Sequence, residues 1–282
     1  MRVAINGFGR IGRTFTRVIQ NYPDIELVAI NDLAETANLR HLLRYDTIHR
    51  RFPGSIEGDG EELIIDGKVV QVSHCPDPAE LPWENLDLDI ILEATGIFRD
   101  SQALAPHLQK ARRVILSAPP NDDIKTIVLG QNEDLLQAED RLLSNASCTT
   151  NSAAPLVNLV QKICGIEHAF ITTVHSYTTD QQLQDGPHAD FRRGRAAAES
   201  IVPTSTGAAK AITRVFPELQ GRIGGAGIRV PVPDGSLTDI TFTVNKTVPE
   251  KTLNQAFEEA AAEGPWKNYL GYTGDPIVSR DV

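Results

Sequence analysis

The chain has 282 residues, enough for about two domains, and its 41% hydrophobic and 23% charged content is that of an ordinary globular protein. A net charge of −10 argues against general binding to nucleic acid or to an anionic membrane surface, and no apolar run reaches the ~18 residues of a membrane span. Cysteines 75, 148 and 164 form neither a disulfide framework nor a metal-binding pair, and no signal peptide precedes the first strand. We therefore expect a cytoplasmic protein without a bound metal.

A strand, a glycine turn and a helix are expected at the start of the chain. Residues 2–6 read as a short buried strand with an apolar centre, Gly7, Gly9 and Gly12 follow at G-x-G-x-x-G spacing, and residues 14–20 are amphipathic. This spacing lets the backbone turn tightly and approach a pyrophosphate at a helix N-terminus. The three glycines therefore predict a dinucleotide site.

An acidic residue follows the second predicted strand, residues 26–30. Asp32 lies 20 residues beyond Gly12, where an acid would bond to the adenosine ribose hydroxyls and disfavour the extra phosphate of NADP. The structural alternative is that Asp32 caps a helix beginning near Thr36. The first interpretation predicts NAD as the cofactor.

The pattern of strands and helices then continues to residue 147. It predicts hairpin strands at 62–65 and 68–72, strands at 88–93, 113–117 and 126–129, and a helix at 101–110. Small residues, Thr95 and Gly96 after one strand and Ser117 at the end of another, leave room for a cofactor along the carboxyl edge of the sheet. We therefore expect an α/β fold, with a Rossmann-type doubly wound parallel sheet in a first domain of residues 1–147.

The chemistry is expected at Cys148, which lies among the small polar residues 144–151 at the start of a long helical segment. A thiol there faces unpaired backbone N–H groups and the positive end of the helix dipole, which favour the thiolate. The alternative is a buried cysteine acting as a small hydrophobe, but the neighbouring hydroxyl and amide groups fit that poorly. Cys148 is therefore the candidate nucleophile, in a helix that holds Pro155 in its first turns or at a kink.

A β-branched and aromatic strand at residues 168–175 carries His175 to its far end. A histidine on a strand is most often packed or on the surface. A cysteine nucleophile nevertheless needs a base, and His175 is the candidate.

Two later segments are candidate anion sites. Residues 176–195 form a long polar segment whose cluster at 192–195 includes Arg193, and a solvated patch or a subunit contact is the alternative. Residues 203–210 are a hydroxyl-rich entry to a helix, another place for a phosphate or carboxylate. With strands at 228–233 and 237–244 and a helix at 249–262, they complete an α+β second domain, residues 148–282, with a mostly antiparallel sheet.

Along nearly its whole length the chain resembles phosphorylating glyceraldehyde-3-phosphate dehydrogenases. The resemblance rests on motifs in family order and spacing at residues 6–13, 144–151, 173–178, 192–193, 203–210 and 229–233. It implies a glycolytic, NAD-dependent oxidoreductase that converts glyceraldehyde 3-phosphate, inorganic phosphate and NAD to 1,3-bisphosphoglycerate and NADH. It also implies a cytoplasmic homotetramer.

The resemblance also implies roles for individual residues. Cys148 would form a thiohemiacetal and then a thioester, with His175 as the base. The implied binding residues are Arg10, Ile11, Asp32, Thr95 and Ser117 for NAD, Thr178, Asp180 and Arg229 for the substrate phosphate, and Ser147, Thr149, Thr206 and Gly207 for inorganic phosphate, with Arg193 near both.

The sequence departs from the family pattern in three places. Family chains continue past a motif like residues 279–281 to an asparagine that contacts the nicotinamide and a final helix, so a chain ending at Val282 is expected to be a fragment or a natural shortening. The family's arginine near the adenine is not evident in residues 72–77. Gly186 stands where NAD-specific relatives often have a larger apolar residue.

Three alternative functions follow from these features. Erythrose-4-phosphate dehydrogenase has a similar cysteine motif and NAD fold, although Thr206 and Gly207 favour the triose enzyme. A non-catalytic NAD-binding interaction protein would account for the end of the chain. A cysteine–histidine hydrolase would leave the glycine turn and Asp32 without a role.

Overall fold

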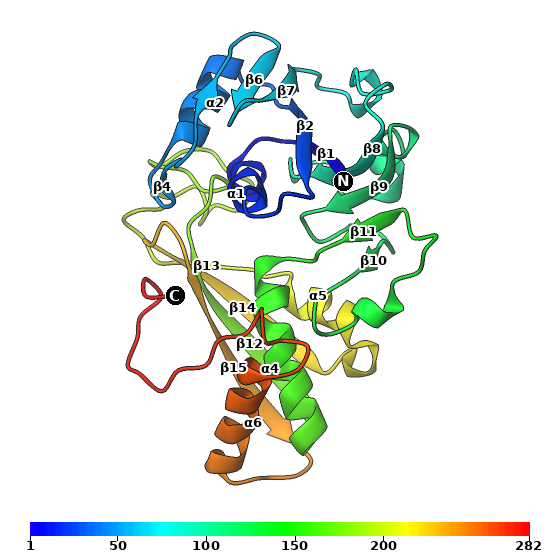
Figure 1. Cartoon of the computed structure of the whole chain (residues 1–282). Helices are drawn as coiled ribbons and strands as arrows, with labels where there is room; N and C mark the ends of the chain where they lie inside the picture. The colour runs from blue at the N-terminus through cyan, green and yellow to red at the C-terminus, as the bar shows by residue number, and fades with distance from the viewer. The chain divides into compact units, whose positions relative to one another are not determined.

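A computed structural model describes residues 1–282, the whole chain. The chain folds into two compact units (Figure 1), one of residues 1–126 and 136–146 and the other of residues 127–135 and 147–282. The segment 127–135, expected in the first domain, therefore belongs to the second unit. None of the helices combines the length and apolar character that a membrane crossing requires.

The first unit is built on a nine-stranded sheet with the order β10-β11-β9-β8-β1-β2-β7-β6-β5. The central strand β1 (Arg2–Asn6) lies between β2 (Glu26–Asn31) and β8 (Leu88–Glu93), and every pair from β10 to β7 is parallel. The remaining strands are β5 (Ile56–Glu57), β6 (Glu62–Ile65), β7 (Lys68–Ser73), β9 (Ala111–Leu116), β10 (Lys125–Thr126) and β11 (Leu142–Ser144). The predicted doubly wound parallel sheet is confirmed, and its strand order reverses between β1 and β8, where such folds bind ligands.

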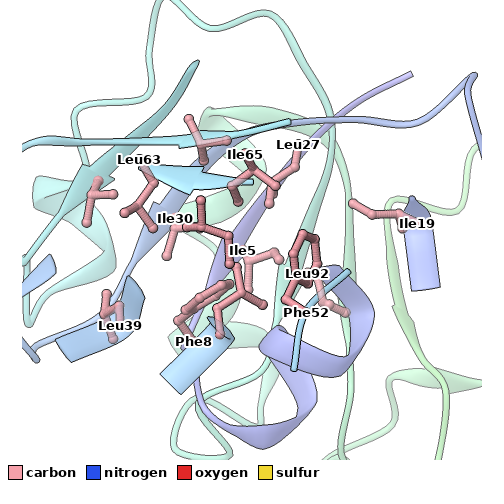
Figure 2. Packing of buried hydrophobic residues seen from close by; sticks show 14 residues of the cluster. Ile5, Phe8, Ile19, Leu27, Ile30, Leu39, Phe52, Leu63, Ile65 and Leu92 are labelled. Atoms are coloured by element: carbon pink, nitrogen blue, oxygen red, sulfur yellow. The ribbon is translucent and has the colours of Figure 1, made fainter. Parts of the chain in front are cut away.

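Helix α1 (Arg10–Ile19) begins before the predicted residue 14, so Gly12 lies in its first turn. The glycine turn before it is anchored by Phe8, which is fully buried among Ile5, Ile30 and Leu92 of the strands (Figure 2). Burial of such a side chain contributes roughly 2–3 kcal/mol. The sheet core therefore fixes the position of the turn.

Two predicted elements of the first unit are wrong in extent. The helix expected at 101–110 is a short α3 (Ser101–Leu104) followed by a 3-10 turn, η2 (His107–Gln109), because Pro106 has no N–H group to continue the helix. The strand expected at 126–129 is reduced to β10. The other short elements are α2 (Thr36–Arg44), β3 (Tyr45–Asp46), β4 (Arg50–Arg51) and η1 (Pro78–Glu80).

The second unit contains a four-stranded sheet with the order β13-β14-β12-β15. Its long strand β12 (Ile166–Ser176) pairs antiparallel with β15 (Ser236–Val244) but parallel with β14 (Ile223–Val230), which in turn pairs antiparallel with β13 (Val202–Thr204). The sheet is therefore mostly antiparallel, as predicted, with one parallel pair. That pair requires a crossover, because parallel strands cannot be joined by a tight hairpin.

Helices α4 (Cys148–Cys164) and α5 (Ala208–Val215) contact this sheet, and α6 (Glu250–Ala262) contacts α4. Pro155 lies inside α4 rather than in its first turn. The unit also contains the 3-10 turns η3 (Glu133–Leu135) and η4 (Pro217–Leu219).

The segment 127–135 joins the second unit through two contacts. Asn158 of α4 donates a hydrogen bond to the Gln131 side chain, and Gly130, at φ +78°, lies against the ring of the buried Trp266. A β-carbon at Gly130 would overlap that ring. Contacts with residues far along the chain therefore decide where this segment belongs.

Candidate active site

Cys148 is the first residue of α4, and Ser147 is the N-cap of that helix. The Ser147 hydroxyl accepts a hydrogen bond from the Thr150 backbone N–H at 3.1 Å and lies 2.8 Å from the Thr150 hydroxyl. A side-chain cap of this kind fixes the residue at which a helix begins. The cap therefore holds the thiol of Cys148 in the first turn of α4.

The strand register brings His175 to the thiol. His175 lies near the end of β12 and pairs with Arg229 of β14, and its Nε2 is 3.2 Å from the sulfur of Cys148. Its Nδ1 is 2.8 Å from the Ser176 carbonyl oxygen, to which Arg229 also donates at 2.8 Å. Arg229 Nη1 also lies 2.9 Å from the same Nδ1, so this nitrogen faces both an acceptor and a donor. Nε2 is the ring nitrogen that faces the thiol and can take its proton.

These contacts favour the thiolate form of Cys148. The hydrogen bond with His175 lowers the pKa of the Cys148 thiol below its ordinary value, although burial opposes the shift by raising it. The charge of His175 and hydrogen bonds involving Thr149 lower the pKa further. A thiolate is the nucleophilic form, so the pair is suited to attack on a carbonyl carbon.

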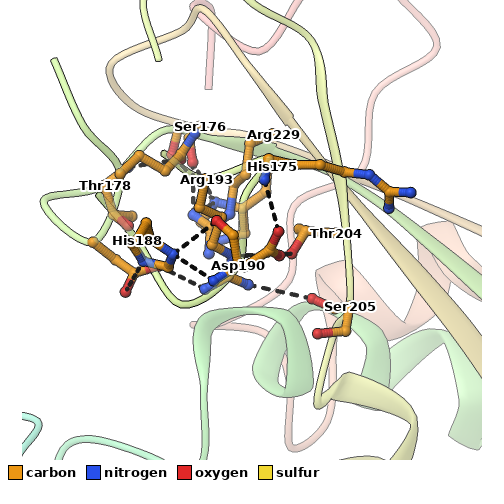
Figure 3. A network of polar contacts seen from close by, with 12 residues as sticks. His175, Ser176, Thr178, His188, Asp190, Arg193, Thr204, Ser205 and Arg229 are labelled. Carbon is orange, nitrogen blue, oxygen red and sulfur yellow. Dashed lines mark hydrogen bonds and ion pairs between the residues drawn. The ribbon is translucent and has the colours of Figure 1, made fainter. Parts of the chain in front are cut away.

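Cationic side chains lie beside this pair in one polar network (Figure 3). The half-buried Arg229 has a lowered pKa, first because of burial and then because of the positive charge of Arg193. Asp180 and Cys148 act in the opposite direction on the same pKa. Arg193, Asp180 and the Cys148 thiol therefore all lie close enough to Arg229 to affect its pKa. The two arginines make this part of the network a candidate anion-binding centre.

Three partners from the long polar loop and β13 hold Arg193. Its guanidinium donates to Asp180 at 2.6 Å, to the Thr204 hydroxyl at 2.9 Å and to the Ser205 carbonyl at 3.4 Å. Burial raises the pKa of Asp180, but Arg193 and His188 outweigh it and keep the pKa below the ordinary value. The predicted residues Asp180 and Arg193 therefore form one ion pair, in which an incoming anion would compete with the carboxylate.

The other predicted phosphate-binding residues lie in different settings. Thr206 accepts a hydrogen bond from the Ala208 backbone at 3.2 Å, at the start of α5, where Gly207 is the exposed N-cap residue. Thr178 is exposed in the loop after β12, whereas Thr149 is buried within α4. The Ser147 hydroxyl is already used by the helix cap.

The first unit has its own cleft at the carboxyl edge of its sheet, with a volume of about 270 Å³. Its walls come from the glycine turn, the end of β2 and the segment after β8. The lining residues used below are Asn6, Gly7, Gly9, Asn31, Asp32, Cys75 and Thr95.

The glycines of this cleft fit a bound dinucleotide. Gly7 has φ +94°, and a β-carbon there would lie 2.5 Å from the Thr95 backbone nitrogen. At Gly9 a β-carbon would meet no protein atom within 4 Å, so packing inside the protein does not account for this glycine. Close approach of a ligand accounts for Gly9, because the dinucleotide fingerprint has a glycine where the backbone approaches the pyrophosphate.

Asp32 links the turn to the end of β2. Its carboxylate accepts hydrogen bonds from the Phe8 N–H at 2.8 Å and from the Ala34 N–H at 3.0 Å. The N-cap of α2 is Glu35, so the alternative that Asp32 caps this helix is wrong. Asp32 is therefore oriented at the rim of the cleft, where ribose hydroxyls are expected.

Five predicted cofactor residues are not among those that line the cleft. Arg10 and Ile11 are exposed in the first turn of α1, Gly12 packs on the Gly7 carbonyl, and Gly96 is in the left-handed region at φ +73°. The Ser117 N–H donates to the Glu93 carbonyl.

Sequence reasoning also missed several polar residues. Asn31 and Cys75 line the cleft, and His188 and Asp190 surround Arg193. The signal for Asn31 was a polar residue at the end of an apolar strand beside Asp32. The pairing of loop residues around Arg193 had no comparable signal.

Comparison with known proteins places both units in one family. Residues 1–101 match the family model described as "Glyceraldehyde 3-phosphate dehydrogenase, NAD binding domain", and residues 147–282 match the C-terminal domain of the same enzyme. The chain belongs to the glyceraldehyde-3-phosphate dehydrogenase family. Family membership confirms the predicted NAD cofactor and an NAD-dependent oxidoreductase as the class of protein.

Several curated members of this family are about half identical to the chain. Glyceraldehyde-3-phosphate dehydrogenase 1 of Bacillus subtilis is 47% identical over 283 residues, which cover 100% of this chain and 84% of that protein. The Thermotoga maritima glyceraldehyde-3-phosphate dehydrogenase is 50% identical over 284 residues, with 100% and 85% covered. The Mycolicibacterium smegmatis enzyme is 48% identical over 291 residues, again with 100% and 85% covered.

Proposed function

We propose that this chain oxidises glyceraldehyde 3-phosphate with NAD and inorganic phosphate to give 1,3-bisphosphoglycerate and NADH. The observation that carries the proposal is the 3.2 Å contact between the Cys148 sulfur and His175 Nε2 at the N-terminus of a helix. The family's NAD-binding domain and relatives that bear the enzyme's name support the same chemistry.

The reaction begins when the Cys148 thiolate adds to the aldehyde carbon and forms a carbon–sulfur bond. His175 Nε2 accepts the proton of the resulting hydroxyl as the hydride leaves the carbon. The backbone N–H of Cys148, at the first position of α4, is a candidate donor to the developing oxyanion, a type of contact worth ~3 kcal/mol when lost. NAD, when bound, accepts the hydride that leaves the same carbon, which becomes a thioester.

The second half of the reaction is cleavage of the thioester by inorganic phosphate. A phosphate oxygen bonds to the acyl carbon, the carbon–sulfur bond breaks, and Cys148 leaves as a thiolate. The contacts that lower the pKa of Cys148 stabilise this leaving group. We place the substrate phosphate near Thr178, Asp180 and Arg229. The attacking phosphate would lie near Ser147, Thr149, Thr206 and Gly207, with Arg193 close to both anions.

In the first unit, we assign NAD to the cleft at the carboxyl edge. Asp32 would bond to the adenosine ribose, and Gly9 would leave room for the pyrophosphate beside α1. Thr95 lies on the opposite wall of that cleft. The remaining proposed cofactor residues are Gly7, Arg10, Ile11, Gly12, Gly96 and Ser117.

We divide the functions of the chain near residue 147, with the cofactor on the N-terminal side and the catalytic residues on the C-terminal side. The segment 127–135 falls on the catalytic side. We also propose a homotetramer, which the family resemblance supports. A cytoplasmic location is supported by the three free cysteines, which suit a reducing compartment. Light scattering on the purified chain tests the tetramer, and a monomer would contradict it.

The first experiment follows NADH absorbance for the purified 282-residue chain with NAD and glyceraldehyde 3-phosphate, with and without inorganic phosphate. Circular dichroism establishes that the chain is folded, and Cys148→Ser is the control that keeps NAD binding without turnover. Sustained turnover that depends on phosphate is expected. Higher kcat/KM with erythrose 4-phosphate would favour the erythrose-4-phosphate enzyme, and NAD binding without turnover would favour a non-catalytic protein.

A further inference from the structure

A continuous row of polar side chains, all buried except the half-buried Ser73, runs beneath the cofactor cleft. It follows the carboxyl ends of four neighbouring parallel strands, with Glu93 on β8, Asn6 on β1, Asn31 on β2 and Ser73 on β7. Each residue pairs in register with the next, so their side chains meet across the sheet. His107, from the 3-10 turn η2, adds a fifth member at one end.

Glu93 and His107 are both fully buried, at 0% exposure. One oxygen of the Glu93 carboxylate, Oε2, accepts from the Asn6 amide at 2.7 Å and lies 3.0 Å from His107 Nε2. The other, Oε1, accepts from the Thr95 backbone N–H at 2.8 Å and from the Thr95 hydroxyl. Three donors, from Asn6 and Thr95, therefore converge on one carboxyl group, and His107 Nε2 is its fourth polar partner.

The two asparagines extend this network to the opposite wall of the cleft. Asn31 donates to Asn6 Oδ1 at 2.8 Å and to the Cys75 carbonyl at 2.9 Å. Its own Oδ1 accepts from the Cys75 N–H at 2.8 Å and from the Ser73 hydroxyl at 2.9 Å. The backbone carbonyl of Asn31 accepts from Gly7 at 2.8 Å, so the network also holds the glycine turn.

The groups that this row orients are those that line the cleft. Asn6, Asn31, Cys75 and Thr95 all contribute to its walls, whereas Glu93 and His107 lie behind them and do not line it. The Thr95 hydroxyl and N–H both point at Glu93, so the carboxylate fixes the conformation of the segment after β8.

We propose that Glu93 and His107 are positioning residues for NAD, acting through Thr95 and Asn6. The proposal rests on the assignment of NAD to this cleft under the proposed function. His107 holds Glu93 in the rotamer that accepts from Thr95, and Glu93 in turn holds the wall against which the cofactor lies.

Stability alone gives a weak reason for this arrangement. A buried pair of polar side chains such as Glu93 and His107 is commonly no more stabilising than apolar side chains of the same volume, because desolvation offsets the attraction. His107 Nδ1 moreover has no hydrogen-bond partner, so the ring is incompletely satisfied where it lies. A network that orients cofactor-binding groups accounts for the buried pair and for the unpartnered Nδ1. The free energy that such a network contributes appears when the ligand binds.

The test uses the full chain and measures NAD binding directly by isothermal titration calorimetry. Glu93→Gln replaces one acceptor oxygen by a donor while keeping the shape, and His107→Leu removes the donor to Glu93. His107→Gln keeps a donor at the same place. The matched control is Lys110→Met, which removes a hydrogen bond to the Leu81 carbonyl and an ion pair with Glu84 beside the same 3-10 turn without touching Glu93.

We expect the Kd for NAD to rise at least tenfold in Glu93→Gln and His107→Leu, and no more than about threefold in His107→Gln and Lys110→Met. The KM for glyceraldehyde 3-phosphate should stay within about twofold in all four. Melting temperatures are measured for each variant, so that lost affinity is separated from lost stability.

An unchanged Kd in folded Glu93→Gln would overturn the proposal, as would a rise in Lys110→Met equal to that in Glu93→Gln. If His107→Leu yields no folded protein, Glu93→Gln and His107→Gln still decide the matter, because the first preserves side-chain shape and the second keeps a polar donor at residue 107. Failure of the unsubstituted chain to bind NAD would instead overturn the assignment of the cofactor cleft.

Discussion

At the scale of single residues, the properties of Cys148 and Arg193 come from their partners. The thiol of Cys148 is 3.2 Å from His175, which lowers its pKa in spite of burial. Arg193 is held by Asp180, Thr204 and Ser205, each bonded to a different nitrogen of the guanidinium. Substitutions that keep the charge or the size of a side chain but change these contacts therefore separate activation of the Cys148 thiol from anion binding by Arg193.

Removal of the base should make Cys148 less reactive at neutral pH. His175→Asn deletes the group that lowers the pKa of the thiol, so the midpoint of iodoacetamide alkylation against pH should move upward. The kcat for oxidation should fall by roughly 10²–10⁴, the usual contribution of a general base. His168→Asn, an exposed histidine on the same strand, is the control and should change neither quantity. A midpoint that stays in place in His175→Asn would show that another group activates the thiol.

Arg193→Lys should weaken anion binding more than it slows the chemistry. Lysine keeps the charge but cannot bond at once to Asp180, Thr204 and Ser205 in a planar fork. We expect KM for inorganic phosphate and for glyceraldehyde 3-phosphate to rise about tenfold, which corresponds to about 1.4 kcal/mol. Steady-state kinetics measure the change, with the exposed neighbour Arg192→Lys as the control. Equal KM values in the two variants would exclude Arg193 from the anion site.

At the scale of elements, the glycine turn between β1 and α1 has two different requirements for glycine. Gly7 combines a positive φ with a close approach to the Thr95 backbone, whereas Gly9 has an ordinary backbone conformation and free space around it. The fold therefore requires glycine at position 7, and the ligand requires it at position 9.

Gly7→Ala and Gly9→Ala should therefore affect different properties. Gly7→Ala should lower the stability of the fold, whereas Gly9→Ala should lower the affinity for NAD. Gly7→Ala should lower the free energy of unfolding by about 1–3 kcal/mol, because alanine is strained at that φ and meets Thr95. Gly9→Ala should leave unfolding within about 0.5 kcal/mol and weaken NAD at least tenfold. Urea denaturation and NAD titration measure the two quantities. If Gly9→Ala bound NAD normally, the pyrophosphate would have to lie elsewhere.

At the scale of the whole molecule, cofactor binding is coupled to stability because NAD binds the folded chain and not the unfolded one. At a free NAD concentration of 100 Kd, the free energy of unfolding should rise by about 2.7 kcal/mol. NADP should give almost no stabilisation, since the Asp32 carboxylate at the rim of the cleft repels the additional phosphate on the ribose 2′ oxygen.

Melting curves with NAD and NADP test this preference. The double variant Asp32→Gly with Leu33→Arg removes the carboxylate and adds a cation beside it, so it should be stabilised by NADP. The unsubstituted chain with NADP is the control. Equal stabilisation of the unsubstituted chain by both cofactors would contradict the role given to Asp32.

Local patterns in the sequence were sufficient for several parts of this protein. The strand, glycine turn and helix at residues 2–19 follow from apolar residues and glycine spacing within one short segment. The position of Cys148 at the start of α4 follows from the polar run before an apolar helix. Pro106 is an equally local signal, because a proline has no N–H group and so interrupts the helix expected at 101–110.

Only the tertiary structure decided how distant segments meet. His175 reaches Cys148 across 27 residues through the register of β12 with its neighbours, and β14 runs parallel to β12, which no local pattern specifies. Likewise, the contact of Gly130 with Trp266 assigns the segment 127–135 to the second unit. The sequence by itself determined the elements and the reactive residue types, because these depend on backbone preferences and periodicity over a few residues. The contacts at Glu93 and Arg193 arise from strand order and loop packing, whose energies depend on residues far apart in the chain.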